Sequence, residues 1–242
     1  MPEGRLQDLI DIQNEVRLAF GWEYADDFES ANQMSLAFDH DVPFGNVDWN
    51  FQGRNETLQE ICKVLMSSKK VVIIGAAAEK EMLEEINQED VSIIAADGSV
   101  GALKGFQNLV CIVSDLDGGE HIDLAAINSQ RFIIHAHGDN HKRWKNILTR
   151  WSKFPNPPRL VLSHQTNEQL IGMENFGGFT DGDRALCFAI WAGVKPQNIE
   201  LIGFSTDKVG EWSGTTNQER KLKKLSWMKK IVSMLNLDPQ ID

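Results

Sequence analysis

The 242-residue sequence lacks the cysteine patterns that hold many small proteins together. Its three cysteines are scattered and none has a CxxC partner, which argues against a disulfide framework and against a thiolate zinc site. Each of them lies in an apolar run. We therefore expect Cys62, Cys111 and Cys187 to be small core residues in a reducing cytoplasm.

Long hydrophobic runs and an excess of basic residues are also missing. No stretch of about 18 apolar residues exists, and the first residues have no apolar signal core, so we expect a cytoplasmic protein that does not enter a membrane. The net charge of -11 repels nucleic-acid phosphates, so we expect no nucleic-acid partner. The one basic cluster is predicted to be the solvated face of a late helix, and it comprises Lys221, Lys223, Lys224, Lys229 and Lys230.

Two common nucleotide-binding motifs are absent as well. The turn Gly75-Ala76-Ala77-Ala78 is not GxGxxG, and no GxxxxGK[ST] segment occurs, so neither a dinucleotide fold of the usual kind nor a P-loop is supported. An ATP site in this chain would need magnesium held by aspartates, backbone amides at helix N-termini and a few cationic side chains.

Two regions are expected from the pattern of apolar residues. Residues 1–54 are rich in aromatics without a clean periodicity, and we interpret them as a small, mainly helical N-terminal subdomain. Residues 55–242 are predicted to form an α/β catalytic domain, in which a helix from about 55 to 66 and another over 78–87 alternate with short apolar strands. This alternation predicts a mostly parallel, Rossmann-like sheet with helices on both faces. The expected strands are 71–74, 92–96, 110–113, 132–135, 160–162 and 199–202.

Acidic residues follow three consecutive predicted strands. Asp97-Gly98 follows the 92–96 strand, Asp115-Leu116-Asp117 follows the 110–113 strand, and His137-Gly138-Asp139-Asn140 follows the 132–135 strand. A fourth group, Thr180-Asp181-Gly182-Asp183, precedes a helix predicted over 184–191. Because ligands of open parallel sheets bind beyond the carboxyl ends of the strands, we expect these groups to converge on one crevice.

The Asp115/Asp117 pair carries the strongest metal signal. Two residues apart in extended chain, the two carboxylates point to one side, and a shared cation would remove their repulsion. Carboxylate oxygens suit Mg²⁺, which binds through one or two carboxylates together with substrate phosphates.

Structural roles remain open for the other acids. Asp97 could serve a strand-to-helix turn, Asp139 could cap the helix that begins near Asn140, and Thr180 with Asp183 resembles a capping box. His135, His137 and His141 lack the usual spacing of a catalytic zinc site, so a phosphate contact, proton transfer or a hydrogen-bonded structural role is favoured for them.

Cationic candidates flank these acids. Arg184 lies three residues after Asp181 and therefore on the same helix face, where it could reach a phosphate. Lys142 and Arg143 could do the same or could be solvated.

Four motifs occur together in the order that is typical of one family. Ala95–Gly98, Ser114–Gly118, His135–Asn140 and Gly178–Ala185 resemble the corresponding segments of archaeal-type 6-hydroxymethyl-7,8-dihydropterin diphosphokinases, which are themselves similar to thiamine diphosphokinases. The resemblance covers roughly residues 90–214. Two segments depart from it: relatives often have a Gly-x-Gly-Pro-Ser-like turn where this chain has Gly75-Ala76-Ala77-Ala78-Glu79, and Gly203–Asp207 matches only in part.

The resemblance implies a magnesium-dependent transfer of diphosphate from ATP to the pterin, with release of AMP, in tetrahydromethanopterin or folate biosynthesis. It implies that Asp115 and Asp117 hold magnesium, with Asp139 and Asp181 as further ligands. Arg184 would neutralise the transferred group, and His137 is the candidate base. ATP or pterin contacts are expected at Asp97, Gly98, Gly138, Asn140 and Thr180.

Other functions stay open on the sequence. Asp115-Leu116-Asp117 also satisfies the DxD pattern of metal-dependent glycosyltransferases, and thiamine diphosphokinase or a non-catalytic nucleotide-binding protein would use a similar site. A homodimer is possible, and residues 1–54 could cap the active site or form the dimer surface.

Overall fold

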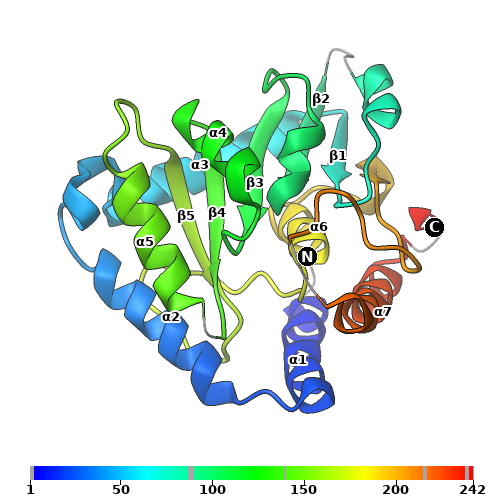
Figure 1. Ribbon diagram of the computed structural model, residues 1–242, viewed down its shortest axis with the longest axis horizontal. Helices are drawn as coiled ribbons and strands as arrows, with labels where there is room; N and C mark the ends of the chain where they lie inside the picture. The colour runs from blue at the N-terminus through cyan, green and yellow to red at the C-terminus, as the bar shows by residue number, and fades with distance from the viewer. Residues whose placement is uncertain (1–2, 87–89, 139, 215–216, 238–239, 242) are drawn as a thin grey trace.

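The computed structural model describes residues 3–86, 90–138, 140–214, 217–237 and 240–241 (Figure 1). Its centre is a six-stranded sheet in which every strand pairing is parallel, as the sequence predicted. The strands are β1 (Lys70–Ile74), β2 (Val91–Ala96), β3 (Leu109–Ser114), β4 (Arg131–Ala136), β5 (Arg159–His164) and β6 (Ile199–Ile202).

The strands form where short runs of branched apolar residues can be covered on both faces. In β1, all four residues from Val71 to Ile74 are buried, and β3 is buried along its whole length. Such continuous runs suit a parallel sheet between two helix layers, because alternate side chains enter opposite cores.

Helices cover both faces of the sheet. One core joins the sheet to α1 (Glu3–Phe20), α3 (Phe51–Ser67), α6 (Asp181–Trp191) and α7 (Gln218–Met234). The opposite core joins it to α2 (Tyr24–Phe38), α4 (Gly119–Ile127) and α5 (His141–Trp151). Short 3₁₀ segments complete the described structure at Pro43–Gly45, Val47–Trp49, Lys80–Ile86, Asp97–Ala102 and Pro196–Asn198.

The strand order β5-β4-β3-β2-β1-β6 creates a switch point between β1 and β6. The chain adds β2 to β5 in sequence on one side of β1, with α4 and α5 on one face of the sheet. It then returns through α6, on the other face, to place β6 on the free side of β1. Connections therefore diverge at the carboxyl ends of β1 and β6, which is where open α/β sheets bind ligands.

The N-terminal helices are built into both cores. Leu9 and Ile12 of α1 are buried in one core, whereas Met34 and Phe38 of α2 are buried in the other. The expected helical character of this segment is confirmed, and the division of the chain at residue 54 stays a prediction.

Several local expectations differ from the structure. The helix expected from about residue 55 begins at Phe51, because the Asn50 side chain accepts the Gly53 N–H at 2.8 Å and so caps it earlier. The α-helix expected over 78–87 is a 3₁₀ segment at Lys80–Ile86 within the described residues. Two of the cysteines, Cys111 and Cys187, are fully buried as expected, while Cys62 is half-buried.

From the sequence we expect that no segment spans a membrane. In the described part of the chain, every helix is too short or too polar to cross a bilayer.

Candidate active site

A pocket opens at the carboxyl edge of the sheet, across the switch point between β1 and β6. It encloses about 950 Å³ of space continuous with solvent. Gly75 to Ala77 after β1 and Gly203 to Ser205 after β6 form its floor, and side chains that follow β2, β3 and β4 form one wall. The N-terminus of α6 and one face of α7 form the opposite wall.

Three aspartates meet on the strand wall. One carboxylate oxygen each from Asp97, Asp115 and Asp117 lies within 4.8 Å of the others. Asp97 and Asp115 are buried and Asp117 is exposed. The sequence prediction that these acids converge is confirmed for this trio.

The backbone that pairs Asp115 with Asp117 is a turn, and not the extended chain on which the prediction was based. Leu116 between them has φ of 70°, its N–H donates to Ser114 Oγ at 2.8 Å, and its side chain is buried. The positive φ costs backbone energy for a branched residue, and burial of the Leu116 side chain offsets that cost. Both carboxylates are thereby turned to the same side of the sheet edge.

The carboxylates disturb one another electrostatically. Burial, followed by the charges of Asp181, Asp117 and Asp115, raises the pKa of Asp97. Burial, with the charge of Asp115 next, raises the pKa of Asp181 to about 7. Such shifts mean that the acids resist carrying their full negative charge together, and a bound cation would relieve that cost. An all-carboxylate set of this kind fits Mg²⁺.

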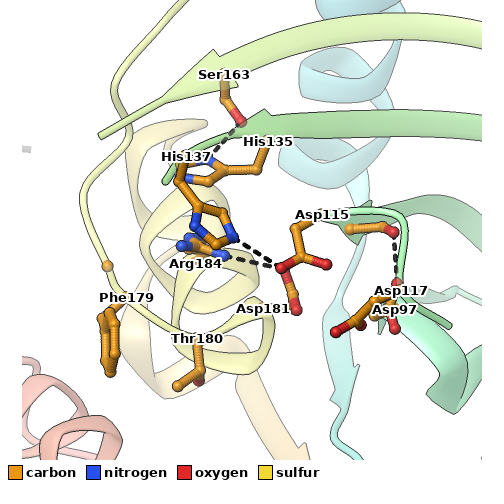
Figure 2. A network of polar contacts seen from close by, with 12 residues as sticks. Asp97, Asp115, Asp117, His135, His137, Ser163, Phe179, Thr180, Asp181 and Arg184 are labelled. Carbon is orange, nitrogen blue, oxygen red and sulfur yellow. Dashed lines mark hydrogen bonds and ion pairs between the residues drawn. The ribbon is translucent and has the colours of Figure 1, made fainter. Parts of the chain in front are cut away.

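Basic side chains lie on the other side of the cluster. His137 Nε2 lies 2.8 Å from Asp115 Oδ2, and Arg143 Nη1 lies 3.5 Å from Asp115 Oδ1 and 3.9 Å from Asp117 Oδ2. Although burial opposes it, the hydrogen bond and charge of His137, with Arg184 and Arg143, hold the pKa of Asp115 below its ordinary value. Figure 2 shows His137 and Arg184 on one side of Asp115 and Asp181, with Asp97 and Asp117 on the other.

The N-terminus of α6 supplies the next group. Arg184 Nη1 donates to Asp181 Oδ1 at 3.1 Å, so the predicted i,i+3 pair forms and lines the pocket. Asp183 is fully buried and accepts from the Thr180 hydroxyl at 2.6 Å and from the Thr180 N–H at 3.0 Å. Asp183 therefore closes a capping box, as interpreted from the sequence, and holds the turn that presents Thr180 and Asp181 to the pocket.

Some expected binding residues lie beside the pocket and do not line it. A Cβ on Gly98 would lie 2.6 Å from the Trp212 carbonyl oxygen, so this glycine allows two backbone segments to approach closely. Asn140 is buried, and its side chain contacts the backbone of His135 and His137. Gly138 does not line the pocket either, and its N–H donates to Asp27. Asp139 lies outside the described residues.

His135 is held by protein partners and lies outside the pocket lining. His135 is buried, with Nδ1 at 3.0 Å from Ser163 Oγ and Nε2 at 3.3 Å from Gln165 Oε1, and burial lowers its pKa. In the ranges that the structure describes, the trio Asp97, Asp115 and Asp117 is the group of side chains able to hold a metal, and it contains no histidine.

The sequence reading missed a wall built from both ends of the chain. Lys221 and Lys224 of α7 line the pocket, together with Trp22 from the α1–α2 connection. Lys224 Nζ lies 5.7 Å from the Trp22 ring centroid and 5.6 Å from that of Phe179, and burial lowers the Lys224 pKa.

The prediction of a solvated basic helix face was therefore wrong for these two lysines. It is confirmed for Lys223, Lys229 and Lys230, which are exposed. A signal was present: Lys221, Lys224 and two apolar residues follow one another at i, i+3, i+4 and i+7, which places them on one helix face. The two apolar residues, Leu225 and Met228, are buried.

Comparison with known proteins identifies similar chains. A family profile described as "6-hydroxymethylpterin diphosphokinase MptE-like" matches residues 46–207. The chain is 35% identical over 186 residues to a protein of Pyrococcus furiosus, covering 73% of this chain and 75% of that protein. It is 29% identical over 247 aligned positions to a protein of Methanocaldococcus jannaschii, covering 92% of each. Both relatives are named 6-hydroxymethyl-7,8-dihydropterin pyrophosphokinase.

Proposed function

We propose, because this chain belongs to the MptE-like 6-hydroxymethylpterin diphosphokinase family, that it transfers the terminal diphosphate of ATP to 6-hydroxymethyl-7,8-dihydropterin and releases AMP. The observation that carries the proposal is that Asp97, Asp115 and Asp117 converge in a pocket that Arg184, Lys221 and Lys224 also line. Phosphoryl transfer is catalysed chiefly by positioning and by charge stabilisation, and this arrangement can supply both.

The reaction joins one oxygen to phosphorus and releases another. The hydroxymethyl oxygen of the pterin attacks the β-phosphorus of ATP, the bond from that phosphorus to the oxygen bridging to the α-phosphate breaks, and AMP leaves with the bridging oxygen. The hydroxyl proton must leave the substrate. His137 is the candidate acceptor, because its ring lines the pocket and its Nε2–H donates to Asp115, so that Nδ1 is the ring nitrogen able to take the proton.

Asp115 and Asp117, with Asp97 and Asp181 nearby, would hold magnesium. The fit rests on the donor set, which is all carboxylate, and on the raised pKa values of Asp97 and Asp181, which reflect negative charge that a cation would compensate. When bound, magnesium neutralises charge on the phosphate oxygens and orients them for in-line transfer.

The opposite wall supplies positive charge and aromatic surface. Arg184, Lys221 and Lys224 line the pocket and can neutralise the charge of the triphosphate. Trp22 and Phe179 offer ring faces against which a flat heterocycle can pack. The N-terminus of α6, which follows Thr180, also lies at the pocket. Helix N-termini commonly bind phosphates through their backbone N–H groups.

The decisive experiment measures AMP formed from Mg·ATP, with 6-hydroxymethyl-7,8-dihydropterin and thiamine offered separately. AMP that appears only with the pterin is expected. AMP that appears only with thiamine would replace the acceptor, and no AMP with either acceptor would overturn the proposal. In that last case, binding of a sugar nucleotide would point to the DxD glycosyltransferase alternative, and binding of Mg·ATP without turnover to a non-catalytic protein.

A further inference from the structure

A buried ion pair joins the two N-terminal helices close to the site. Arg17 Nη1 of α1 lies 2.8 Å from Asp27 Oδ2 of α2, and both side chains are 5% exposed. Neither residue lines the pocket. A buried ion pair is weak evidence for stability, because an apolar pair of similar volume often serves the fold equally well. The role of the Arg17–Asp27 pair therefore has to be inferred from the other groups that these two side chains contact.

One carboxylate oxygen of Asp27 binds the backbone next to His137. Asp27 Oδ1 accepts the Gly138 N–H at 2.6 Å, and Gly138 has φ of 46°. One turn later on α2, Ser30 Oγ donates to Asn140 Oδ1 at 2.7 Å, and the same amide oxygen accepts the His137 N–H at 3.1 Å. Two residues of one helix face thus hold the backbone that presents the His137 ring to Asp115.

The other carboxylate oxygen of Asp27 is linked to Arg184 through the side-chain amide of Gln165. Gln165 Nε2 donates to Asp27 Oδ2 at 2.8 Å, and Gln165 Oε1 accepts from Arg184 Nη2 at 2.8 Å. Arg17 Nη1 also donates to the Gln165 backbone oxygen at 2.9 Å. An ionised carboxylate only accepts and a guanidinium only donates, so their places on either side of Gln165 determine which way its amide faces.

The orientation of that amide matters for the site. Arg184 uses its other terminal nitrogen to bind Asp181 at the pocket wall. With Gln165 Oε1 accepting from Nη2, both ends of the guanidinium are held, and its position relative to the carboxylates is determined.

We propose that Asp27 is a positioning residue, which orients Arg184 through Gln165 and His137 through Gly138, and that the N-terminal helices thereby complete the active site. The proposal rests on the proposed function for its activity readout. Asp27 lies in neither the pocket lining nor the acid cluster, so it reaches the site only through the contacts that lead to Arg184 and His137.

The variant Asp27→Asn tests the proposal at the amide. An asparagine can keep an oxygen toward the Gly138 N–H, but its NH₂ group then faces two other donors, the Gln165 NH₂ group and the Arg17 guanidinium. Gln165 must lose that contact or turn its donor toward Arg184, which also only donates. We expect kcat for AMP release to fall at least about tenfold, because misplacement of a charge-stabilising group is costly in phosphoryl transfer.

A double-mutant cycle separates positioning from folding. Asp27→Asn is measured in the native chain and in an Arg184→Gln background, at equal concentrations of folded protein. If Asp27 acts through Arg184, its factor in the background should be at least about threefold smaller. The cycle is repeated in a His137→Gln background, and equal factors in the native chain and in both backgrounds would overturn the proposal, since a merely structural residue would cost the same in each. Asp26→Asn is the matched control, because Asp26 is exposed in the same helical turn, and it should leave kcat unchanged.

Two further arrangements keep the test decisive. If Asp27→Asn does not fold by circular dichroism, Gln165→Met takes its place in the same cycle, since it leaves the Arg17–Asp27 pair intact. The cycle is also read on the Kd of Mg·α,β-methylene-ATP, which cannot be cleaved at the transferred bond. If the native chain shows no pterin-dependent turnover, the proposed function alone is refuted. If the effects of the two substitutions on this Kd are additive, the positioning role alone is refuted.

Discussion

The two walls of the pocket come from different kinds of structure. The acidic wall consists of residues that directly follow β2 and β3, so sheet geometry alone brings them together. The cationic and aromatic wall gathers Trp22, Arg184 and Lys224 from segments far apart in the chain. The first wall depends on local sequence and a parallel sheet, whereas the second depends on how α1, α6 and α7 pack over one core.

The difference predicts how each wall responds to substitution. A carboxylate lost from the acidic wall removes part of the metal site, with a large effect on chemistry and a small effect on folding. A change in the opposite wall should alter substrate affinity and orientation.

Asp117→Asn should abolish turnover, with a loss in kcat of about a thousandfold or more, because the variant removes a proposed magnesium ligand. The free energy of unfolding should stay the same or increase, because Asp117 is exposed and its negative charge repels that of Asp97. AMP release and thermal unfolding with and without Mg²⁺ measure both effects. The native protein should gain melting temperature from Mg²⁺ and the variant should not. Full activity in Asp117→Asn would remove the basis for a metal on this wall.

Lys224→Met should raise the KM for Mg·ATP about tenfold and lower kcat less, because one charge that interacts with Asp115 and Asp181 is lost while an unbranched side chain stays beside Trp22 and Phe179. Steady-state kinetics at varied Mg·ATP give the split. Lys229→Met is the control on the same helix, because Lys229 is exposed and should tolerate the change. Equal effects of the two variants would show that the net charge of α7, and not the position of Lys224, matters.

Trp22→Leu should weaken binding of the heterocyclic substrate by about tenfold, equivalent to about 1.4 kcal/mol, because a flat ring face is lost from the pocket. Trp22→Phe should restore most of that affinity. Because Trp22 also stacks on Phe20 at a centroid distance of 4.6 Å, melting temperatures of both variants are measured alongside KM for the pterin and for ATP. If Leu and Phe variants bind equally well, the Trp22 ring is structural and does not contact substrate.

The two walls also explain what could be predicted from the sequence. Asp97, Asp115 and Asp117 were found because each follows a short apolar run that could only be a strand, and parallel strand ends share one edge. The turn at Leu116 was not foreseen, since its positive φ depends on the burial of its side chain and on the Ser114 hydroxyl.

Lys221, Lys224 and Trp22 were missed for a different reason. A lysine-rich helix presents the same composition whether its lysines face water or a pocket, and only the position of α7 against the rest of the fold decides between the two. The expected roles of Gly98, Gly138 and Asn140 stay predictions; the structure shows them supporting backbone that leads into the pocket. Contacts between residues as distant as Asp27 and Gly138 depend on tertiary structure, and no periodicity in the sequence reports them.

His164 is the last residue of β5 and does not line the pocket, so its substitution gives the smallest expected effect on catalysis. His164 is 3% exposed, its Nδ1 accepts the Thr166 N–H at 3.2 Å, and burial lowers its pKa from 6.5 to about 4. Between these values the unfolded chain binds a proton that the folded chain does not, so this histidine lowers the free energy of unfolding as the pH falls through that range. The full loss, reached at about pH 4, is about 3 kcal/mol, and stability is fully present above pH 6.5.

His164→Gln should therefore flatten the pH dependence of stability between pH 6.5 and 4 while kcat at neutral pH changes less than about twofold, because His164 does not line the pocket. Urea unfolding at several pH values, with AMP release at pH 7, measures the two quantities. A parallel fall in kcat would show that the β5 end communicates with the pocket. Gln165, the next residue, would then be the route to examine, since its side chain bonds to Arg184. An unchanged kcat with flattened acid sensitivity would show that His164 affects the stability of the fold and has no part in the reaction.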